Sequence, residues 1–393
     1  MKKFLAMALA LLMVAVLLPV TAMAEVTALP ARGTTLPDAV GGVIKLTEDV
    51  TLSDMVTFGE GKTVTLNLNG KTLTGPTNNK PAISVNNATL TITGNGTISG
   101  YAAVQVVGNT TRSGEATKSV LVVENGTLTG SEYGILFIGN GADVTVNGGT
   151  ITGGDNAAIM SNGTVNDTSD QGHTKLVVNG GTITGNTRTQ GYANCAIYLP
   201  NSGTAMINGG TIKGTTGAGI VVRGGSLTVN GGTIEGHGQG GDNIKMGDAN
   251  PTYCGGIEVG FSTNYPGGIA DVKIAGGTIS SETSEAFLVI GEKPTDGASA
   301  NATITVTGGT FNGQYTEKVA GYFPQGSDLV IKDGKVQPRT ITIIVPSEGG
   351  STTTTPSTDT TKNPSTGAND FVGVAAAAAV MALLGSAVVL RKK

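Results

Sequence analysis

One short pattern of apolar, polar and glycine positions recurs along most of the chain. In its clearest form it reads Val-Asn-Gly-Gly-Thr-Ile-Thr-Gly, at residues 146–153. Closely similar copies stand at 178–185, 207–214 and 229–236, and looser ones at 274–281 and 306–313. Apolar residues alternate with polar ones on both sides of the glycine pair, which is typical of two short β-strands joined by a tight bend. Because repeats decide an architecture, the pattern predicts a fold of stacked, similar units.

A third short apolar run precedes the copies of this pattern. It is found at residues 82–85, 103–106, 134–137, 196–199, 219–222, 256–259 and 286–289. Three short strands per repeat, with no helical pattern between them, are typical of one coil of a parallel β-helix, whose coils stack at about 4.8 Å. We therefore predict an all-β fold over residues 25–339, a right-handed single-stranded parallel β-helix of about ten coils. The handedness follows from the general preference of parallel crossovers.

The spacing of the repeats favours this fold over other repeat architectures. Neighbouring bends lie 22 residues apart at Gly210 and Gly232 but 45 apart at Gly232 and Gly277. Propeller blades need a steadier spacing, whereas the corners of a β-helix tolerate loops of any length. One polar position is constant, since Asn147, Asn179, Asn208 and Asn230 fill the same slot in four successive repeats. We expect these side-chain amides to form a hydrogen-bonded ladder along the stack.

The first 24 residues have the form of a secretory signal peptide. Lys2 and Lys3 precede an apolar run at 4–20, and Ala22-Met23-Ala24 matches the small-residue cleavage pattern. The alternative is a membrane anchor that is retained. Near the other end, residues 340–362 are rich in Thr, Pro and Ser and indicate an extended stalk without a core.

Residues 363–393 combine a short motif, an apolar span and a basic tail. The motif is Asn363-Pro364-Ser365-Thr366-Gly367, the span covers 371–390, and Arg391-Lys392-Lys393 follow. Twenty apolar or small residues are long enough to cross a bilayer, with the basic end on the cytoplasmic side. This order resembles the sortase sorting signal of Gram-positive surface proteins, although Asn363 stands where Leu is usual.

The resemblance implies cleavage after Thr366 and covalent attachment of its carbonyl to peptidoglycan. Sortase and peptidoglycan would then be partners of the C-terminus, the protein would reside at the cell wall, and the membrane would be contacted only before processing. A plain membrane-anchoring helix is the alternative interpretation of the same residues.

Composition excludes some functions. The formal net charge is −4 and only 13% of residues are charged, so the chain has no electrostatic footprint for nucleic acid. His173 and His237 are the only histidines and neither belongs to a Cys/His cluster, which argues against zinc. We expect no cofactor, apart from a possible calcium site described below.

The predicted coils resemble the pectate-lyase type of β-helix, which carries polysaccharide lyases, glycoside hydrolases, adhesins and carbohydrate-binding surface proteins. Fold alone assigns no function, so the outward columns of side chains must be compared with the chemistry. The outer column of the upstream apolar run, called the Ser84 column, is predicted to contain Ser84, Gln105, Leu136, Met160, Tyr198, Val221, Glu258 and Leu288. The outer column of the strand after the glycine bend is predicted to contain Thr152, Thr184, Lys213, Glu235, Ser280 and Asn312. Neither column supplies the pair of carboxylates that glycoside hydrolysis needs.

Two candidate sites remain. Exposed aromatic rings at Tyr198, Tyr253, Phe261 and Tyr265, beside Glu258, would stack on sugars, unless they are isolated surface or core aromatics. Asp242, Asp248 and Glu258 are candidate calcium ligands near a long insertion, but no calcium-loop spacing is present and ordinary solvated charges are the alternative.

Cys195 and Cys254 permit a geometric test. Both precede the same strand of their coils, but one coil lies between them, and two coil steps of about 9–10 Å exceed the limit of about 7 Å for a disulfide. We therefore expect two partly buried thiols, unless the insertion before Cys254 moves that residue inward.

The sequence as a whole predicts a cell-wall-anchored surface protein, an adhesin or glycan-binding module without catalysis. The alternatives are a polysaccharide lyase or glycoside hydrolase on the same scaffold, and a structural surface spacer.

Overall fold

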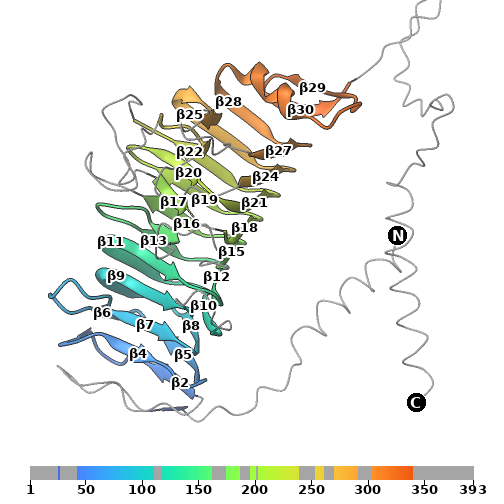
Figure 1. Ribbon diagram of the computed structural model, residues 1–393. Helices are drawn as coiled ribbons and strands as arrows, with labels where there is room; N and C mark the ends of the chain where they lie inside the picture. The colour runs from blue at the N-terminus through green and yellow to red at the C-terminus, as the bar shows by residue number, and fades with distance from the viewer. Residues whose placement is uncertain are drawn as a thin grey trace, which may run out of the picture. The chain divides into compact units, whose positions relative to one another are not determined.

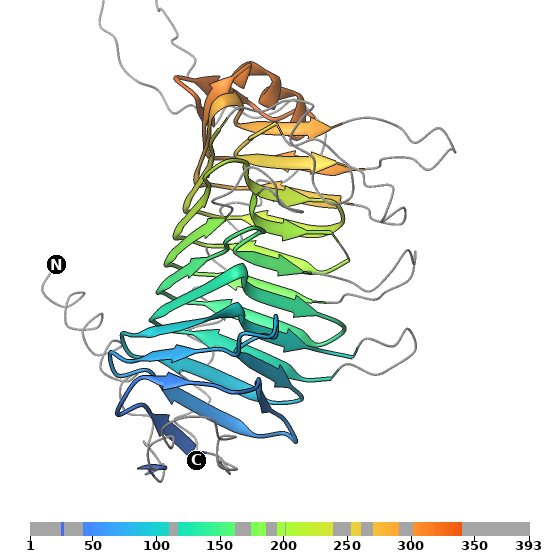
Figure 2. The same ribbon diagram turned by 90° about the vertical axis from the view of Figure 1, so that its left-hand side faces the viewer.

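The computed structural model describes residues 25–26, 42–109, 117–161, 174–185, 195–200, 202–238, 253–260, 270–290 and 302–339. These all belong to the first of two compact units, Met1–Arg339. Apart from one 3₁₀ helix, the elements described are β-strands, and Figures 1 and 2 show them stacked coil upon coil.

The first face of the stack is an eleven-stranded parallel sheet. Its strands are, in order, β1 (Glu25–Val26), β2 (Gly42–Lys45), β5 (Thr63–Asn67), β8 (Thr89–Thr93), β10 (Ser119–Val123), β12 (Ala142–Val146), β15 (Lys175–Val178), β18 (Thr204–Ile207), β21 (Gly225–Val229), β24 (Ala270–Ile274) and β27 (Thr303–Val306). From β2 onwards each strand opens one coil, so the count agrees with the predicted ten coils.

The second ladder follows the glycine bend of each coil. It contains β3 (Val50–Thr51), β6 (Thr72–Thr74), the first part of β9 (Thr97–Val107), the first part of β11 (Thr127–Ile138), β13 (Thr150–Thr152), β16 (Thr182–Gly185), β19 (Thr211–Gly214), β22 (Thr233–Gly236), β25 (Thr278–Glu285) and β28 (Thr310–Gln314). All of these strands pair in parallel.

The third ladder completes each coil. It contains β4 (Val56–Phe58), β7 (Ile83–Asn86), the later parts of β9 and β11, β14 (Ile159–Ser161), β17 (Cys195–Leu199), β20 (Ala218–Val222), β23 (Ile257–Gly260) and β26 (Phe287–Ile290). Three parallel ladders of this kind are consistent with the predicted parallel β-helix.

Aliphatic side chains from all three ladders fill the inside of the stack. In the second ladder Ile151, Ile183, Ile212 and Ile234 occupy successive coils in register, and each is fully buried. Burying such a side chain contributes roughly 1.5–3 kcal/mol to folding. The alternation of apolar and polar residues therefore holds each coil on its neighbours.

The Asn-Gly-Gly corner requires glycine for a steric reason. The second glycine has a positive φ in successive coils, 85° at Gly181 and 86° at Gly210. A Cβ at Gly210 would also lie 2.8 Å from the carbonyl oxygen of Gly181, closer than such atoms approach. Stacked corners thus leave no room for a side chain.

The last coil is closed by elements that differ from the repeat. A 3₁₀ helix, η1 (Thr316–Tyr322), is followed by the antiparallel hairpin of β29 (Leu329–Lys332) and β30 (Lys335–Pro338). Tyr322 packs edge-on against Phe287, with ring centroids 5.5 Å apart. At the opposite end, Glu25 and Val26 pair in parallel with Val43 and Ile44.

The predicted signal peptide, stalk, sorting motif and apolar span lie outside the described residues. Among the residues that the structure describes, no helix is long and apolar enough to cross a membrane.

Candidate functional site

The predicted Ser84 column has the expected register but not the expected exposure. Ser84, Gln105, Leu136, Met160, Tyr198, Val221, Glu258 and Leu288 are paired along the third ladder as the repeat implies. Tyr198, however, is only 4% exposed, and Val221 is fully buried. Met160, Tyr198 and Val221 belong to a second apolar cluster with Ala157, Cys195 and Ala218. The expectation that Tyr198 is exposed for stacking is therefore wrong.

Glu258 is also buried, with an exposed fraction of 0%. Its Oε1 accepts hydrogen bonds from the backbone N–H groups of Tyr253 and Gly255, both at 2.9 Å. These bonds hold the turn in which Cys254 has a φ of 60°. The carboxylate thus fixes a turn in the backbone. Asp242, Asp248, Phe261 and Tyr265, which the sequence predicted to accompany Glu258, lie outside the described residues. Within the part of the chain that the structure describes, no group of three or more His, Cys, Asp or Glu side chains could hold a metal ion.

Cys195 and Cys254 are both buried thiols. Cys195 pairs with Ala218 of the next coil, and Cys254 follows one coil later, which agrees with the predicted separation of two coil steps. Burial, and then the nearby carboxylate of Glu258, raise the pKa of the Cys254 thiol to about 12.

A regular, partly exposed surface is formed by the outside of the second ladder, which we call the threonine face. Its first column contains threonine in nine successive coils: Thr72, Thr97, Thr127, Thr150, Thr182, Thr211, Thr233, Thr278 and Thr310. Its second column contains Thr51, Thr74, Ser99, Thr129, Thr152, Thr184, Lys213, Glu235, Ser280 and Asn312. Hydroxyl and methyl groups therefore repeat at the coil spacing of about 4.8 Å.

Strand propensity alone does not account for this uniformity. Threonine suits strands and forms favourable cross-strand pairs, which would favour it on every outer face. The equivalent outer column of the first sheet is nevertheless mixed: Val43, Thr65, Thr91, Val122, Thr145, Val177, Met206, Thr228, Lys273 and Thr305. The same stack thus provides an internal comparison: the first column of the threonine face keeps threonine over nine successive coils, whereas this column of the first sheet does not.

A ladder of amides borders the threonine face, as the sequence predicted. The Nδ2 of each asparagine donates to the Oδ1 of the asparagine one coil earlier, at 2.8 Å for Asn179, Asn208 and Asn230. The series ends on Glu124, whose Oε1 accepts from Asn147 at 3.0 Å. Because these amides donate hydrogen bonds to one another, they stabilise the corner and leave few donors and acceptors for a ligand.

The opposite border of the threonine face carries polar and aromatic groups that sequence reasoning missed. The rings of Tyr101 and Tyr133 lie in contact there, with centroids 5.9 Å apart. Tyr101 directly follows the corner glycine Gly100, whereas Tyr133 stands three residues after Gly130, so the repeat gives no common position from which both could have been predicted.

Further along this border, His237 contacts two carboxylates. Its Nε2 lies 3.1 Å from Oε2 of Glu235, and its Nδ1 lies 3.3 Å from Oε2 of Glu282. The two glutamates belong to β22 and β25, which are neighbouring strands. The sequence predicted no pair of carboxylates on adjacent coils within the two outer columns. Glu282 belongs to neither column, because it lies two residues beyond Ser280 in β25.

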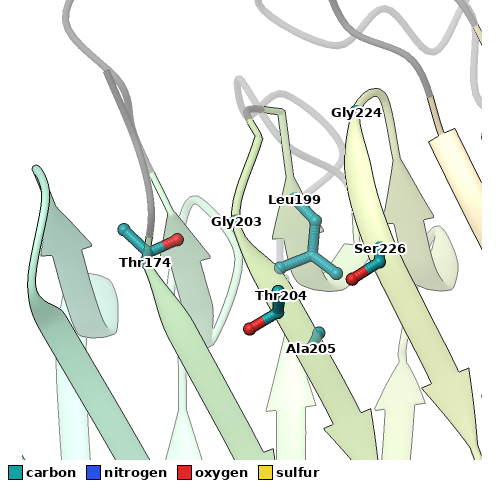
Figure 3. A pocket seen from close by; sticks show the side chains of 7 residues that line it. All are labelled: Thr174, Leu199, Gly203, Thr204, Ala205, Gly224 and Ser226. Carbon is teal, nitrogen blue, oxygen red and sulfur yellow. The ribbon is translucent and has the colours of Figure 1, made fainter. Parts of the chain in front are cut away.

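Figure 3 shows a small hollow near the start of β18. It is lined by Thr174, Leu199, Gly203, Thr204, Ala205, Gly224 and Ser226, and its volume of about 180 Å³ includes open solvent. Pockets for small molecules usually measure about 300–1,000 Å³. The hollow is therefore too small to be the principal site.

Comparison with known proteins assigns no family. The chain matches no protein-family model, no curated protein and no solved structure.

Proposed function

We propose that this protein binds an extended polysaccharide on its threonine face, without catalysis, while held at the surface of a Gram-positive cell. The observation that carries the proposal is the column of nine threonines in register from Thr72 to Thr310. A long row of identical threonine side chains can make the same contact many times with a ligand that is itself a repeating polymer. A polysaccharide has this property, and its many hydroxyls can exchange hydrogen bonds with threonine side chains.

The charge of the face also suits a neutral or weakly charged polymer. Within its two columns, Lys213 and Glu235 are the charged residues, and they stand opposite each other on adjacent strands. One is positive and the other negative, so the net charge of the two columns is close to zero and the face neither attracts nor repels a charged polymer strongly.

Attachment to the cell is proposed from the sequence. Export would use residues 1–24, the stalk would be 340–362, and the motif from Asn363 to Gly367 would direct sortase to join Thr366 to peptidoglycan. The right-handed winding of the coils is likewise an expectation from general chirality.

The test compares two faces of one protein. Full-length protein is incubated with a panel of insoluble and soluble polysaccharides, and retention is measured. A variant with Thr150→Lys and Thr182→Lys places two long charged side chains on the threonine face. The matched control, Thr65→Lys and Thr91→Lys, makes the same change at two neighbouring strands on the outside of the first sheet.

We expect the wild type and the control to be retained and the threonine-face variant to lose affinity about tenfold or more, or about 1.4 kcal/mol. Equal retention of the two variants, or no retention of the wild type on any polymer, would contradict the proposal.

A second candidate function is supported by the contact of His237 with Glu235 and Glu282. Carboxylates and an imidazole are the groups that general acid–base cleavage of a glycan uses. Release of reducing ends, or of unsaturated uronate products, that disappears in Glu282→Gln would establish this alternative in place of binding alone.

A further inference from the structure

The border of the threonine face is built differently at two neighbouring coils. Strands β9 and β11 run through the corner without a break and pair on both sides of it. Their register shifts between Gly130 and Tyr133, so that Ser131 and Glu132 together stand opposite Tyr101. Such a bulge re-aims side chains locally. Here it places a tyrosine, a glutamate and a second tyrosine at one corner.

The two tyrosine rings form a partly exposed aromatic pair. Their planes are inclined by 76°, an edge-to-face arrangement that aromatic rings favour. Tyr133 also packs against the second apolar cluster, which fixes the position of its ring. Burial, and then the charge of Glu132, raise the pKa of Tyr101 above its ordinary value. The pair is therefore a fixed surface with one carboxylate close to it.

The carboxylate is held from the next coil. The side-chain amide of Asn156, which is only 1% exposed, donates to Oε2 of Glu132. The backbone N–H groups of Asp155 and Asn156 donate to the carbonyl oxygens of Ser131 and Glu132, at 2.8 and 3.2 Å. A buried amide that orients a half-exposed carboxylate leaves the other side of that carboxylate for a ligand's hydroxyl groups.

We propose that Tyr101, Glu132, Tyr133 and Asn156 form a subsite for one neutral hexose unit of the bound polysaccharide. Tyrosine rings contact the apolar C–H face of a sugar, and a carboxylate accepts hydrogen bonds from its hydroxyls. The charges at this corner come from Glu132 and Asp155 and are negative, which disfavours a uronate. This proposal rests on the proposed function, because the subsite opens beside the threonine face and would fix one unit of a chain lying there.

The test uses full-length protein and defined neutral oligosaccharides, with cello-, xylo- and manno-oligosaccharides as probes, in calorimetric titrations. Tyr101→Ala and Glu132→Ala remove the ring and the carboxylate, while Tyr101→Phe retains the ring. Tyr315→Ala is the matched control, because Tyr315 is 57% exposed and lies at the far cap. Denaturation curves establish that each variant is folded, which matters most for Glu132 because of its contact with Asn156.

We expect at least one probe to bind the wild type, with affinity about tenfold weaker for Tyr101→Ala and Glu132→Ala and within about threefold for Tyr101→Phe and Tyr315→Ala. If polysaccharide retention depends on the threonine face but Tyr101→Ala and Glu132→Ala bind as the wild type does, the subsite is overturned and the proposed function stands. If the wild type binds neither polymers nor oligosaccharides, the proposed function itself fails and the subsite with it.

Discussion

The side-chain amide of Asn208 lies directly above that of Asn179 and donates a hydrogen bond to its Oδ1 at 2.8 Å. On its other side it accepts a bond of the same length from Asn230. One exposed side chain therefore connects three successive coils. This connection runs beside the glycine corner, which carries the same residues in each of these coils.

Replacing Asn208 by alanine should lower the free energy of unfolding. The change removes two hydrogen bonds, each worth about 0.5–1.5 kcal/mol, from an exposed position where water replaces part of the loss. We expect a decrease of about 1–2 kcal/mol, measured by denaturant unfolding. In a double-mutant cycle with Asn179→Ala the two effects should not add, because both changes break the same bond. Strict additivity would show that the ladder contributes nothing through this pair.

The ladder can also be extended. Ala275 fills the asparagine slot one coil after Asn230, since the backbone N–H of each donates to the preceding coil in the same way. Ala275→Asn should add an amide that donates to Oδ1 of Asn230 and raise the free energy of unfolding by up to about 1 kcal/mol. Thr228→Asn, on the outside of the first sheet, is the control for a general effect of added asparagine. A lower stability of Ala275→Asn than of the wild type would contradict the prediction.

These residues show why so much of the fold was predictable. The glycine bend marks the register of each repeat, so Asn147 aligns with Asn179 and Thr150 with Thr182 without any knowledge of coordinates. Once the register is known, the period of two decides which side chains face the core. The amide ladder and the ten coils follow from these two rules.

The register and the period of two did not predict how exposed the side chains of the outer columns are. Period two assigns Tyr198 to the outside of its strand, but a second apolar cluster buries it, and no local pattern in the sequence signals that cluster. The pairing of His237 with Glu282 was missed because a long insertion separates them in sequence, and only the register between β22 and β25 brings them together. Tyr133 was missed because a bulge shifts its register by one residue.

The glycine corner provides a sharper test of the stacking geometry. In Gly210→Ala the residue would keep a φ of 86° and place its Cβ 2.8 Å from a carbonyl oxygen of the coil below. Strain of this kind costs about 1–3 kcal/mol, which should appear as a lower denaturation midpoint. Gly321→Ala is the matched control, because a Cβ there meets nothing within 4 Å. Equal effects of the two substitutions would mean that the corners are not packed as described.

The buried thiol of Cys254 should make stability depend on pH in the alkaline range. Its pKa rises from an ordinary value of 9.0 to about 12 in the folded protein, because of burial and the charge of Glu258. The unfolded chain therefore releases this proton first as the pH rises, so the contribution of Cys254 is fully present below pH 9 and is lost progressively between about pH 9 and pH 12. A loss on the order of a few kcal/mol is expected across this window.

Tyrosine and lysine side chains also titrate in that range, so the measurement must isolate the thiol. Denaturation midpoints of the wild type and of Cys254→Ala are compared at several pH values from 8 to 11. The variant is expected to be less stable near neutrality, because it loses packing at a buried position, but its stability should fall less steeply above pH 9. Parallel curves for the two proteins would show that the thiol ionises as readily in the folded state as in the unfolded chain, which is incompatible with its burial beside Glu258.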